Sequence, residues 1–414
     1  MVLREPFASI IIRDMESLRE LYRIGYGPSS SHTMGPRKAC EDFIDRHPDV
    51  KSVKAELFGS LAATGKGHLT DKAIREAFKE RGKEAEIFWF PDVFKKFHPN
   101  CLSLSSSDDS VSETYYSVGG GKIVREGDES EGESEVYSDD DIGNMEKLLA
   151  YCDREGLHFW EVATEREGDG ILDYMRDVWA VMKDAIKRGL ENEGVLPGGL
   201  KLARKACLVH EQALGMAGAL GNTLIAHSYA LAVSEENAGG GKIVTAPTCG
   251  SCGVLPGALY YIQEEYKIPE VRILRALLTA GMVGNIVKTN GSISGAEVGC
   301  QGEVGVACAM AGAAVCYLLG GSIYQCEYAA EMGLEHHLGL TCDPLKGLVQ
   351  IPCIERNGFA CMRAVDHASY ALVGDGRHKI SFDDVVEVMM ETGHALPSLY
   401  RETSMGGLAR VYEV

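Results

Sequence analysis

A long uncharged stretch constrains the fold of this chain more than any other feature of its sequence. No residue between Glu303 and Glu327 is charged, and this run is long enough for one helix to cross a bilayer. Its residues are mostly small, however, and neither a Lys or Arg cluster nor an aromatic belt flanks it. We therefore interpret residues 304–326 as a helix buried in a protein core, where small side chains let neighbouring backbones approach closely.

The composition predicts a soluble, folded protein. Apolar residues make up 45% and charged residues 24% of the 414 residues, which is ordinary for a globular chain. The formal net charge of −19 argues against binding to nucleic acid or to an acidic membrane, since both need a basic face. The first 14 residues carry charges within their only short apolar run, so we expect no secretory signal. Thirteen cysteines, an odd number spread through a long chain, favour a reducing cytoplasm over a disulfide framework.

Strand and helix patterns alternate in the first part of the chain. Alternation of apolar residues predicts strands at residues 52–58 and 85–90, and Gly119–Gly121 predicts a hairpin within residues 114–124. Residues 37–46 and 72–81 are predicted to be helical. Two polar runs, residues 103–112 and the acidic residues 126–141, are typical of solvated loops, and we place the domain boundary in the second.

Helical periodicity dominates the remainder, as in residues 172–188 and 199–233. Glycine and proline interrupt it at residues 196–199, 239–241 and 246–257, where we expect loops at the working surface. The predicted architecture is an α+β domain over residues 1–143, ending in an acidic linker, followed by a mainly α-helical domain over residues 144–414.

Cys249 and Cys252 form a CxxC motif, which on its own indicates zinc binding or redox chemistry. No second CxxC or paired-histidine motif accompanies it, and no thioredoxin-like βαβ pattern surrounds it. We favour a packing role for both thiols, with a zinc hydrolase as the alternative.

Three other cysteines, Cys300, Cys342 and Cys353, each lie close to glycine or proline. Backbone amides there are free to face a ligand, and amides around sulfur stabilise the negative charge of an iron–sulfur cluster. Their separations of 42 and 11 residues match no compact ferredoxin motif. Cys308 and Cys316, within the apolar stretch, are interpreted as core residues.

The run from Ser29 to Thr33 precedes Gly35 and Pro36 at the start of a predicted helix. Its small polar residues suit helix caps, and the same hydroxyls and free amides suit a bound carboxylate, so both interpretations stay open on the residues alone. His32 lies in this run. His68 follows Gly65, Lys66 and Gly67 in GKGHLTD, which favours an exposed loop where a base can approach a ligand.

Five segments together resemble the iron–sulfur-dependent bacterial L-serine dehydratases, in the order of that family and over most of the chain. They are RIGYGPSSSHTMGP (23–36), FGSLAATGKGHLTD (58–71), APTCGSCGVLPG (246–257), NGSISGAEVGCQGEVG (290–305) and CDPLKGLVQIPCIERN (342–357). The resemblance implies a first domain of the serine dehydratase β type, similar to allosteric-substrate-binding domains. It implies conversion of L-serine to pyruvate and ammonia at a [4Fe–4S] cluster, without pyridoxal phosphate.

The resemblance also implies residue roles. Cys300, Cys342 and Cys353 are the implied cluster ligands, which leaves one iron open to act as a Lewis acid. His68 is the implied base for the α-proton, since a neutral imidazole suits that task, and the active site is expected between the domains. The implied contacts to the substrate come from the serine-rich run and, at second rank, from the block that precedes Cys300: Ser29, Ser30, Ser31, His32, Thr33, Asn290, Ser292 and Ser294.

This chain departs from some relatives in two respects. Some divide the two domains between subunits, whereas here they are fused. Others end in a cysteine that caps the fourth iron, whereas the last cysteine here is Cys361, so we expect a weaker oxygen ligand on that iron. Alternatives are elimination on L-cysteine or another small β-substituted amino acid, and a regulatory protein that senses serine and oxygen. A homodimer is the expected assembly.

Overall fold

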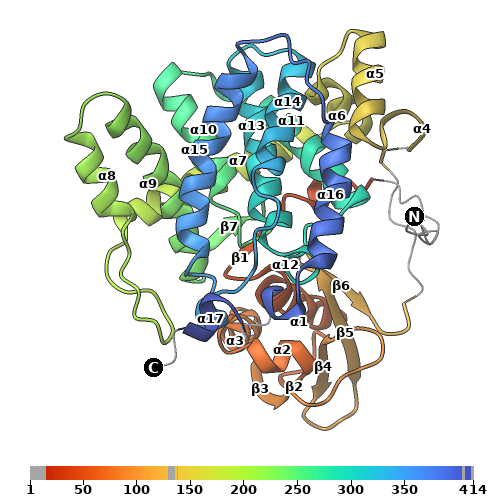
Figure 1. Cartoon of the computed structure of the whole chain (residues 1–414). Coiled ribbons are helices and arrows are strands. Elements are labelled where there is room, and N and C mark those ends of the chain that lie inside the picture. The colour runs from red at the N-terminus through yellow and green to blue at the C-terminus, as the bar shows by residue number, and fades with distance from the viewer. Residues whose placement is uncertain (1–14, 129–135, 138, 403–405, 412–414) are drawn as a thin grey trace.

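The computed structural model describes residues 15–128, 136–137, 139–402 and 406–411. Figure 1 shows a helical part above a smaller part built on a sheet. Within the described residues the sheet has five strands in the order β3-β2-β4-β5-β6, in which β2 and β3 are parallel and the other pairs antiparallel. The strands are β2 (Ser52–Phe58), β3 (Glu84–Phe90), β4 (Asn100–Ser106), β5 (Ser112–Gly119) and β6 (Lys122–Arg125).

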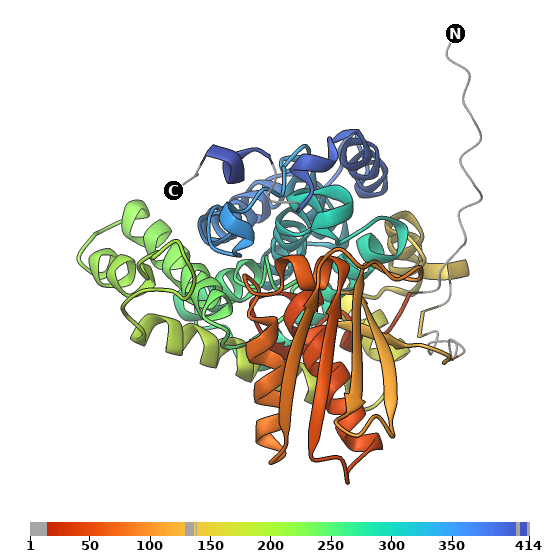
Figure 2. The same ribbon diagram turned by 90° about the horizontal axis from the view of Figure 1, so that it is seen from below.

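Helices α1 (Gly35–Arg46) and α3 (Thr70–Glu80) cover one face of this sheet (Figure 2). Phe43 and Phe78 from these helices pack with Leu57 and Leu104 from the strands in one buried cluster. The short helix α2 (Gly59–Thr64) follows β2 directly. The predicted strands, helices and hairpin of this part are therefore confirmed.

Residues 103–112 are not a loop throughout, contrary to the prediction. Their first four residues lie in β4, where Leu102 and Leu104 are buried and the serines between them take the other positions of the strand. The Ser103 hydroxyl lies 2.9 Å from that of Thr114 on β5. Serine is a weak strand former, so the serine-rich composition of this segment did not indicate a strand. The alternation typical of a strand is visible only in the buried leucines.

The apolar stretch forms two buried helices rather than one. Helix α13 (Val304–Leu318) ends near Gly320, whose φ of +94° suits glycine, and α14 (Ile323–Glu335) begins with a capping box between Ser322 and Gln325. The helix that is long and apolar enough to span a membrane, Cys300–Leu318, is 94% buried. The predicted burial in the core is confirmed, and the predicted single helix is wrong.

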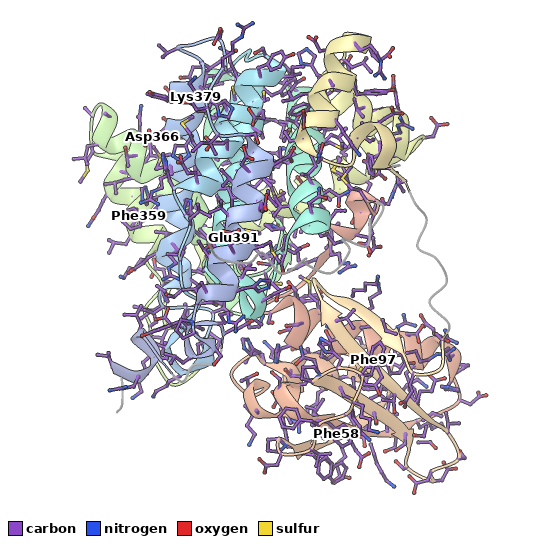
Figure 3. The ribbon with its side chains drawn as sticks, turned by 45° about the vertical axis from the view of Figure 1, so that its right-hand side comes forward. Phe58, Phe97, Phe359, Asp366, Lys379 and Glu391 are labelled. Atoms are coloured by element: carbon purple, nitrogen blue, oxygen red, sulfur yellow. The ribbon has the colours of Figure 1, made fainter. Side chains whose placement is uncertain are left out.

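Further helices pack around α13 (Figure 3, in which Phe359 lies on α15 and Glu391 on α16). Residues 172–188 are helical as predicted, whereas residues 199–233 are divided between two helices at Gly215–Gly218. In chain order the helices outside the α+β part are α4 (Asp139–Ile142), α5 (Met145–Glu155), α6 (Phe159–Glu167), α7 (Ile171–Glu191), α8 (Ala206–Leu214), α9 (Ala219–Ala238), α10 (Val254–Tyr266), α11 (Glu270–Asn290), α12 (Gly295–Val298), α13, α14, α15 (Cys353–Ala371), α16 (Phe382–Ala395) and α17 (Leu408–Val411).

The beginning of the described chain packs with the helical part. Strand β1 (Ile24–Tyr26) pairs antiparallel with β7 (Lys242–Val244). The 3-10 helix η1 (Leu18–Glu20) and Tyr22 lie in the same buried cluster as α11 and α13, and the Tyr22 hydroxyl donates to the Leu277 carbonyl at 2.8 Å. The domain boundary at residues 143/144 stays a prediction, but residues 15–26 contribute to the helical core rather than to the sheet.

Candidate active site

The serine-rich run forms a one-turn π-helix, η2 (Ser30–Met34), directly before α1. Ser29 caps this turn, because its side chain accepts a hydrogen bond from the His32 amide at 3.2 Å. Pro36 lies in the first turn of α1 as predicted, but the residue at the N-cap of α1 is Met34, which makes no side-chain capping bond. The predicted capping residue therefore caps η2 rather than α1. The turn of η2 places the hydroxyls of the serine run near His32.

His32 and His68 pack against each other, with ring centroids 4.7 Å apart and the ring planes tilted by 35°. Two threonines brace them reciprocally: the Thr33 hydroxyl donates to the His68 carbonyl at 2.7 Å, and the Thr70 hydroxyl donates to the His32 carbonyl at 2.5 Å. His68 is 3% exposed, so the predicted exposed loop is wrong. The glycines before His68 do not expose the loop but allow it to pack closely, since a Cβ on Gly65 would lie 2.3 Å from the Leu61 carbonyl oxygen.

Burial keeps both imidazoles neutral. It lowers the pKa of His32 from 6.5 to about 4, and it lowers the pKa of His68 well below 6.5, with the neighbouring His32 adding to the effect. Nδ1 of His68 is buried without a hydrogen-bond partner. A neutral imidazole at physiological pH is the form that accepts a proton.

One cavity of about 560 Å³ joins the two parts of the chain. His32 and His68 line it on the α+β side, and Cys342 and Cys353 line it on the helical side. The structure thus brings together predicted residues that are nearly 300 positions apart in the sequence. The other lining residues of the predicted set are Ser29, Ser30, Ser31, Ser292 and Ser294.

The three predicted cysteine ligands are neighbours in the structure. Burial raises the pKa of Cys342, the charges of Glu303 and Glu402 raise it further, and those that Cys300 and Cys353 would carry add to the effect. Burial, followed by Cys300, likewise raises the pKa of Cys353. Burial raises the pKa of Cys300 to about 11, and a hydrogen bond from Arg356 opposes that rise. Buried thiols that disfavour one another as anions need a cation to become thiolates, which fits a metal cluster.

The donor set also fits a cluster rather than a single ion. Within the part of the chain that the structure describes, no three His, Cys, Asp or Glu side chains converge on one position as a mononuclear metal site requires. A cubane distributes its protein thiolates over separate irons, so its ligands surround a volume instead of a point. Cys300, Cys342 and Cys353 would hold such a group.

Sequence reasoning missed two acidic residues beside the cysteines. Glu303 accepts a hydrogen bond from the Thr248 hydroxyl at 2.7 Å, and its other carboxylate oxygen lies 3.9 Å from Sγ of Cys342. Glu402 lines the cavity and its backbone amide donates to the Cys342 carbonyl at 2.7 Å. Glu303 lies in the block around Cys300 and could have been considered, whereas nothing in the sequence near Glu402 indicates the site.

Cys249 and Cys252 have the packing role that was favoured. Both are 1% exposed and belong to a small apolar cluster with Met34. The Cys249 amide donates to the Ser30 hydroxyl at 3.0 Å, so the CxxC turn holds the serine run in place through this bond. The absence of a converging ligand set among the described residues gives the zinc alternative no support.

Two predicted substrate contacts lie away from the cavity lining. The Asn290 amide donates to the Gly143 carbonyl at 2.7 Å, where it ties α11 to the chain between α4 and α5. Thr33 positions His68 through its backbone, as described above. Ser292 lines the cavity, and its hydroxyl donates to the Glu297 carboxylate at 2.7 Å.

The fold and the site define a two-domain enzyme whose cavity is lined by a pair of neutral imidazoles and by the thiols of Cys342 and Cys353; Cys300 lies close to these two cysteines but does not line the cavity. Family models for the serine dehydratase beta chain and alpha chain match residues 17–84 and 102–409, respectively. This alpha and beta organisation marks the iron–sulfur type of serine dehydratase, as distinct from the pyridoxal phosphate type.

Curated relatives resemble nearly the whole chain. An L-serine dehydratase from Streptomyces coelicolor is 42% identical over 95% of this chain and 98% of its own length. L-serine dehydratase TdcG and L-serine dehydratase 1, both from Escherichia coli, are 41% and 40% identical, each over 95% of this chain and 99% of its own length. The chain belongs to the single-chain L-serine dehydratases, a family of L-serine ammonia-lyases that carries its beta and alpha regions on one polypeptide.

Proposed function

We propose that this protein eliminates water from L-serine and releases pyruvate and ammonia. The observation that carries the proposal is the shared cavity, because it joins a base on one domain to a thiol set on the other. Family membership supports the substrate, since the relatives named above are L-serine dehydratases. We propose a soluble, cytoplasmic location, and the homodimer stays a prediction.

The serine run is proposed to hold the substrate carboxylate. The hydroxyls of Ser29 and Ser31 lie 3.4 Å apart on the cavity wall, and that of Ser31 lies 2.9 Å from Nδ1 of His32. Hydroxyl donors and the amides of a helix start are suitable partners for a carboxylate. Binding there would place the α-carbon of serine on the side of the cavity where His68 lies.

His68 is proposed to remove the α-proton. Its lowered pKa means that the imidazole is neutral before the reaction, and burial in the cavity wall protects it from bulk water. When bound by Cys300, Cys342 and Cys353, a [4Fe–4S] cluster supplies a Lewis acid that assists departure of the β-hydroxyl. Loss of the proton and of hydroxide leaves aminoacrylate and water, and the enamine then tautomerises and hydrolyses to pyruvate and ammonia.

The proposal is tested by anaerobic purification, followed by iron and sulfide analysis and a pyruvate assay with L-serine and with L-cysteine. We expect about four irons and four sulfides per chain and turnover of L-serine. Cys342→Ser should lose most of the iron and the activity, whereas the control Cys361→Ser changes a buried thiol outside the cavity and should keep both. Fully active protein with pyridoxal phosphate and no iron would contradict the proposal, and preferential turnover of L-cysteine would reassign the substrate.

A further inference from the structure

Gln301 follows Cys300 in the chain and has every hydrogen-bonding position of its side chain occupied. The side chain is completely buried. Its amide nitrogen donates to the carbonyls of Val298 at 2.7 Å and Met389 at 3.3 Å. Its amide oxygen accepts from the Gly339 amide at 2.9 Å. It also lies 3.0 Å from the Thr392 hydroxyl, whose one proton is shared with the Val388 and Met389 carbonyls at 2.9 and 3.1 Å. Such a fully satisfied buried amide has one well-defined orientation.

These bonds connect three segments that are distant in the sequence. Val298 ends α12, Gly339 lies three residues before Cys342, and Met389 and Thr392 belong to α16. The backbone amide of Gln301 adds a further bond, to the Leu340 carbonyl at 3.4 Å. Gln301 therefore ties the turn that carries Cys300 to the segment that leads into Cys342, with α16 as the support for both (Figure 1 shows α16 beside α12).

The backbone of the same turn leaves no room for adjustment. Gly299 has φ of +78°, and a Cβ there would lie 2.7 Å from the Leu340 carbonyl oxygen. A Cβ on Gly302 would lie 2.4 Å from a methyl group of Val298 and 2.8 Å from the Ser292 carbonyl oxygen. Gly299 thus packs the turn against the segment that leads into Cys342, and Gly302 packs it against the residues that precede Cys300. The Gln301 amide provides the directional contacts.

We propose that Gln301 is a positioning residue, which fixes Cys300 relative to Cys342 so that the thiols have the spacing of a cluster before iron binds. This inference rests on the proposed role of the three cysteines. Residues that orient metal ligands from behind typically change metal affinity 10- to 100-fold when they are replaced. Preorganisation of this kind matters most for ligands that come from distant parts of a chain, as Cys300 and Cys342 do.

The test compares Gln301→Leu with wild type and with the control Gln263→Leu, which removes a partly buried amide bond to the Ile268 carbonyl; Gln263 does not line the cavity. Two readouts are used: the rate of iron loss in air from reconstituted protein, and the rate at which Cys300 is alkylated by iodoacetamide in the apoprotein, followed by mass spectrometry. We expect Gln301→Leu to lose iron about 10- to 100-fold faster and to alkylate faster at Cys300. Gln301→Glu keeps the acceptor oxygen but places a second oxygen against the Val298 and Met389 carbonyls, so it should also lose iron faster than wild type.

Wild-type rates in Gln301→Leu, or equal acceleration in Gln263→Leu, would overturn the proposal. If Gln301→Leu fails to fold, the milder Gln301→Met decides the question, because it keeps the length of the side chain and removes its bonds to the Val298 and Met389 carbonyls and from the Gly339 amide: faster iron loss supports the positioning role and unchanged loss refutes it. Wild-type protein that binds no iron would refute the proposed function instead. In that case Cys300 alkylation still reports whether Gln301 holds the turn.

Discussion

The two active-site histidines show how a buried pair is built from segments 36 residues apart. Each imidazole is held through its own backbone carbonyl by a threonine beside the other histidine, so neither ring uses a nitrogen for its placement in this brace. Burial then excludes the protonated form of both side chains. The packing of the two histidines therefore fixes both the position and the protonation state of their imidazoles.

Replacement of His68 by alanine should lower the turnover of L-serine at least about a hundredfold, which is the usual contribution of a general base. Iron content should not change, because His68 is on the opposite side of the cavity from the cysteines. The measurement is kcat for pyruvate release at equal iron content, with His394→Ala, an exposed histidine on α16, as the control. Near-normal turnover would transfer the role of base to His32.

The lowered pKa of His32 predicts a dependence of stability on pH. Above pH 6.5 the residue is neutral in both folded and unfolded chains. Between pH 6.5 and about 4 only the unfolded chain binds the proton, so the free energy of unfolding falls as the pH falls through this window. Urea unfolding of the apoprotein at several pH values should show a smaller acid-side decrease in His32→Asn. Equal slopes for both proteins would contradict the assigned pKa.

Residue chemistry in the site could be predicted in part from the sequence. Glycine and proline beside Cys300, Cys342 and Cys353 indicated a ligand role, and the structure brings these thiols together. The burial of His68 could not be predicted, because Gly65 and Lys66 have the composition of a surface loop while the packing against Leu61 depends on the fold. Asn290 and Glu402 depend in the same way on contacts between distant segments.

At the scale of elements, the helices with regular periodicity and the strands with clear alternation were predictable. Two other features were not predicted. The serine-rich composition of β4 is not typical of a strand, and the all-apolar composition of residues 304–326 does not show where α13 ends and α14 begins. A helix that is apolar on every side carries no periodicity from which its end can be located. The break is marked only by Gly320, Gly321 and the capping residue Ser322.

The contact between α13 and α14 provides a prediction at this scale. A Cβ on Gly333 would lie 2.7 Å from the backbone of Ala309, so the two helices touch at this point. Gly333→Ala should therefore destabilise the apoprotein by about 1–3 kcal/mol, the usual cost of overpacking a core. Urea unfolding measures the loss, with Gly374→Ala at an open, exposed position as the control. An unchanged midpoint for Gly333→Ala would show that the helices separate easily.

At the scale of the whole molecule, the division of the core between the two parts does not follow the order of the chain. Residues 15–26 precede the sheet in the chain but complete the helical core through β1, Leu18 and Tyr22. No sequence pattern predicts this pairing, because strands of three residues are too short to show an alternation. The two parts of the molecule are therefore joined by packing as well as by the acidic segment.

A fragment of residues 144–414 should not fold alone, since it lacks the strand beside β7 and the side chains that cover Leu277. Supplying residues 1–143 as a second polypeptide should restore soluble material that elutes as a complex. The measurement is the soluble yield of the helical fragment, alone and coexpressed, by size-exclusion chromatography. A well-folded fragment without its partner would show that β1 and Tyr22 contribute little to the core.

The pairing of β1 with β7 also has a consequence for biosynthesis. Ile24 leaves the ribosome early, yet its partner Val244 is translated about 220 residues later. At about 5–20 residues per second, the first strand waits roughly 10 to 45 seconds for its neighbour. During that interval the sheet domain can fold, whereas Leu18, Leu21 and Tyr22 remain without a core to enter. The nascent chain therefore carries an early segment whose protection from aggregation depends on chaperones until the middle of the protein has been made.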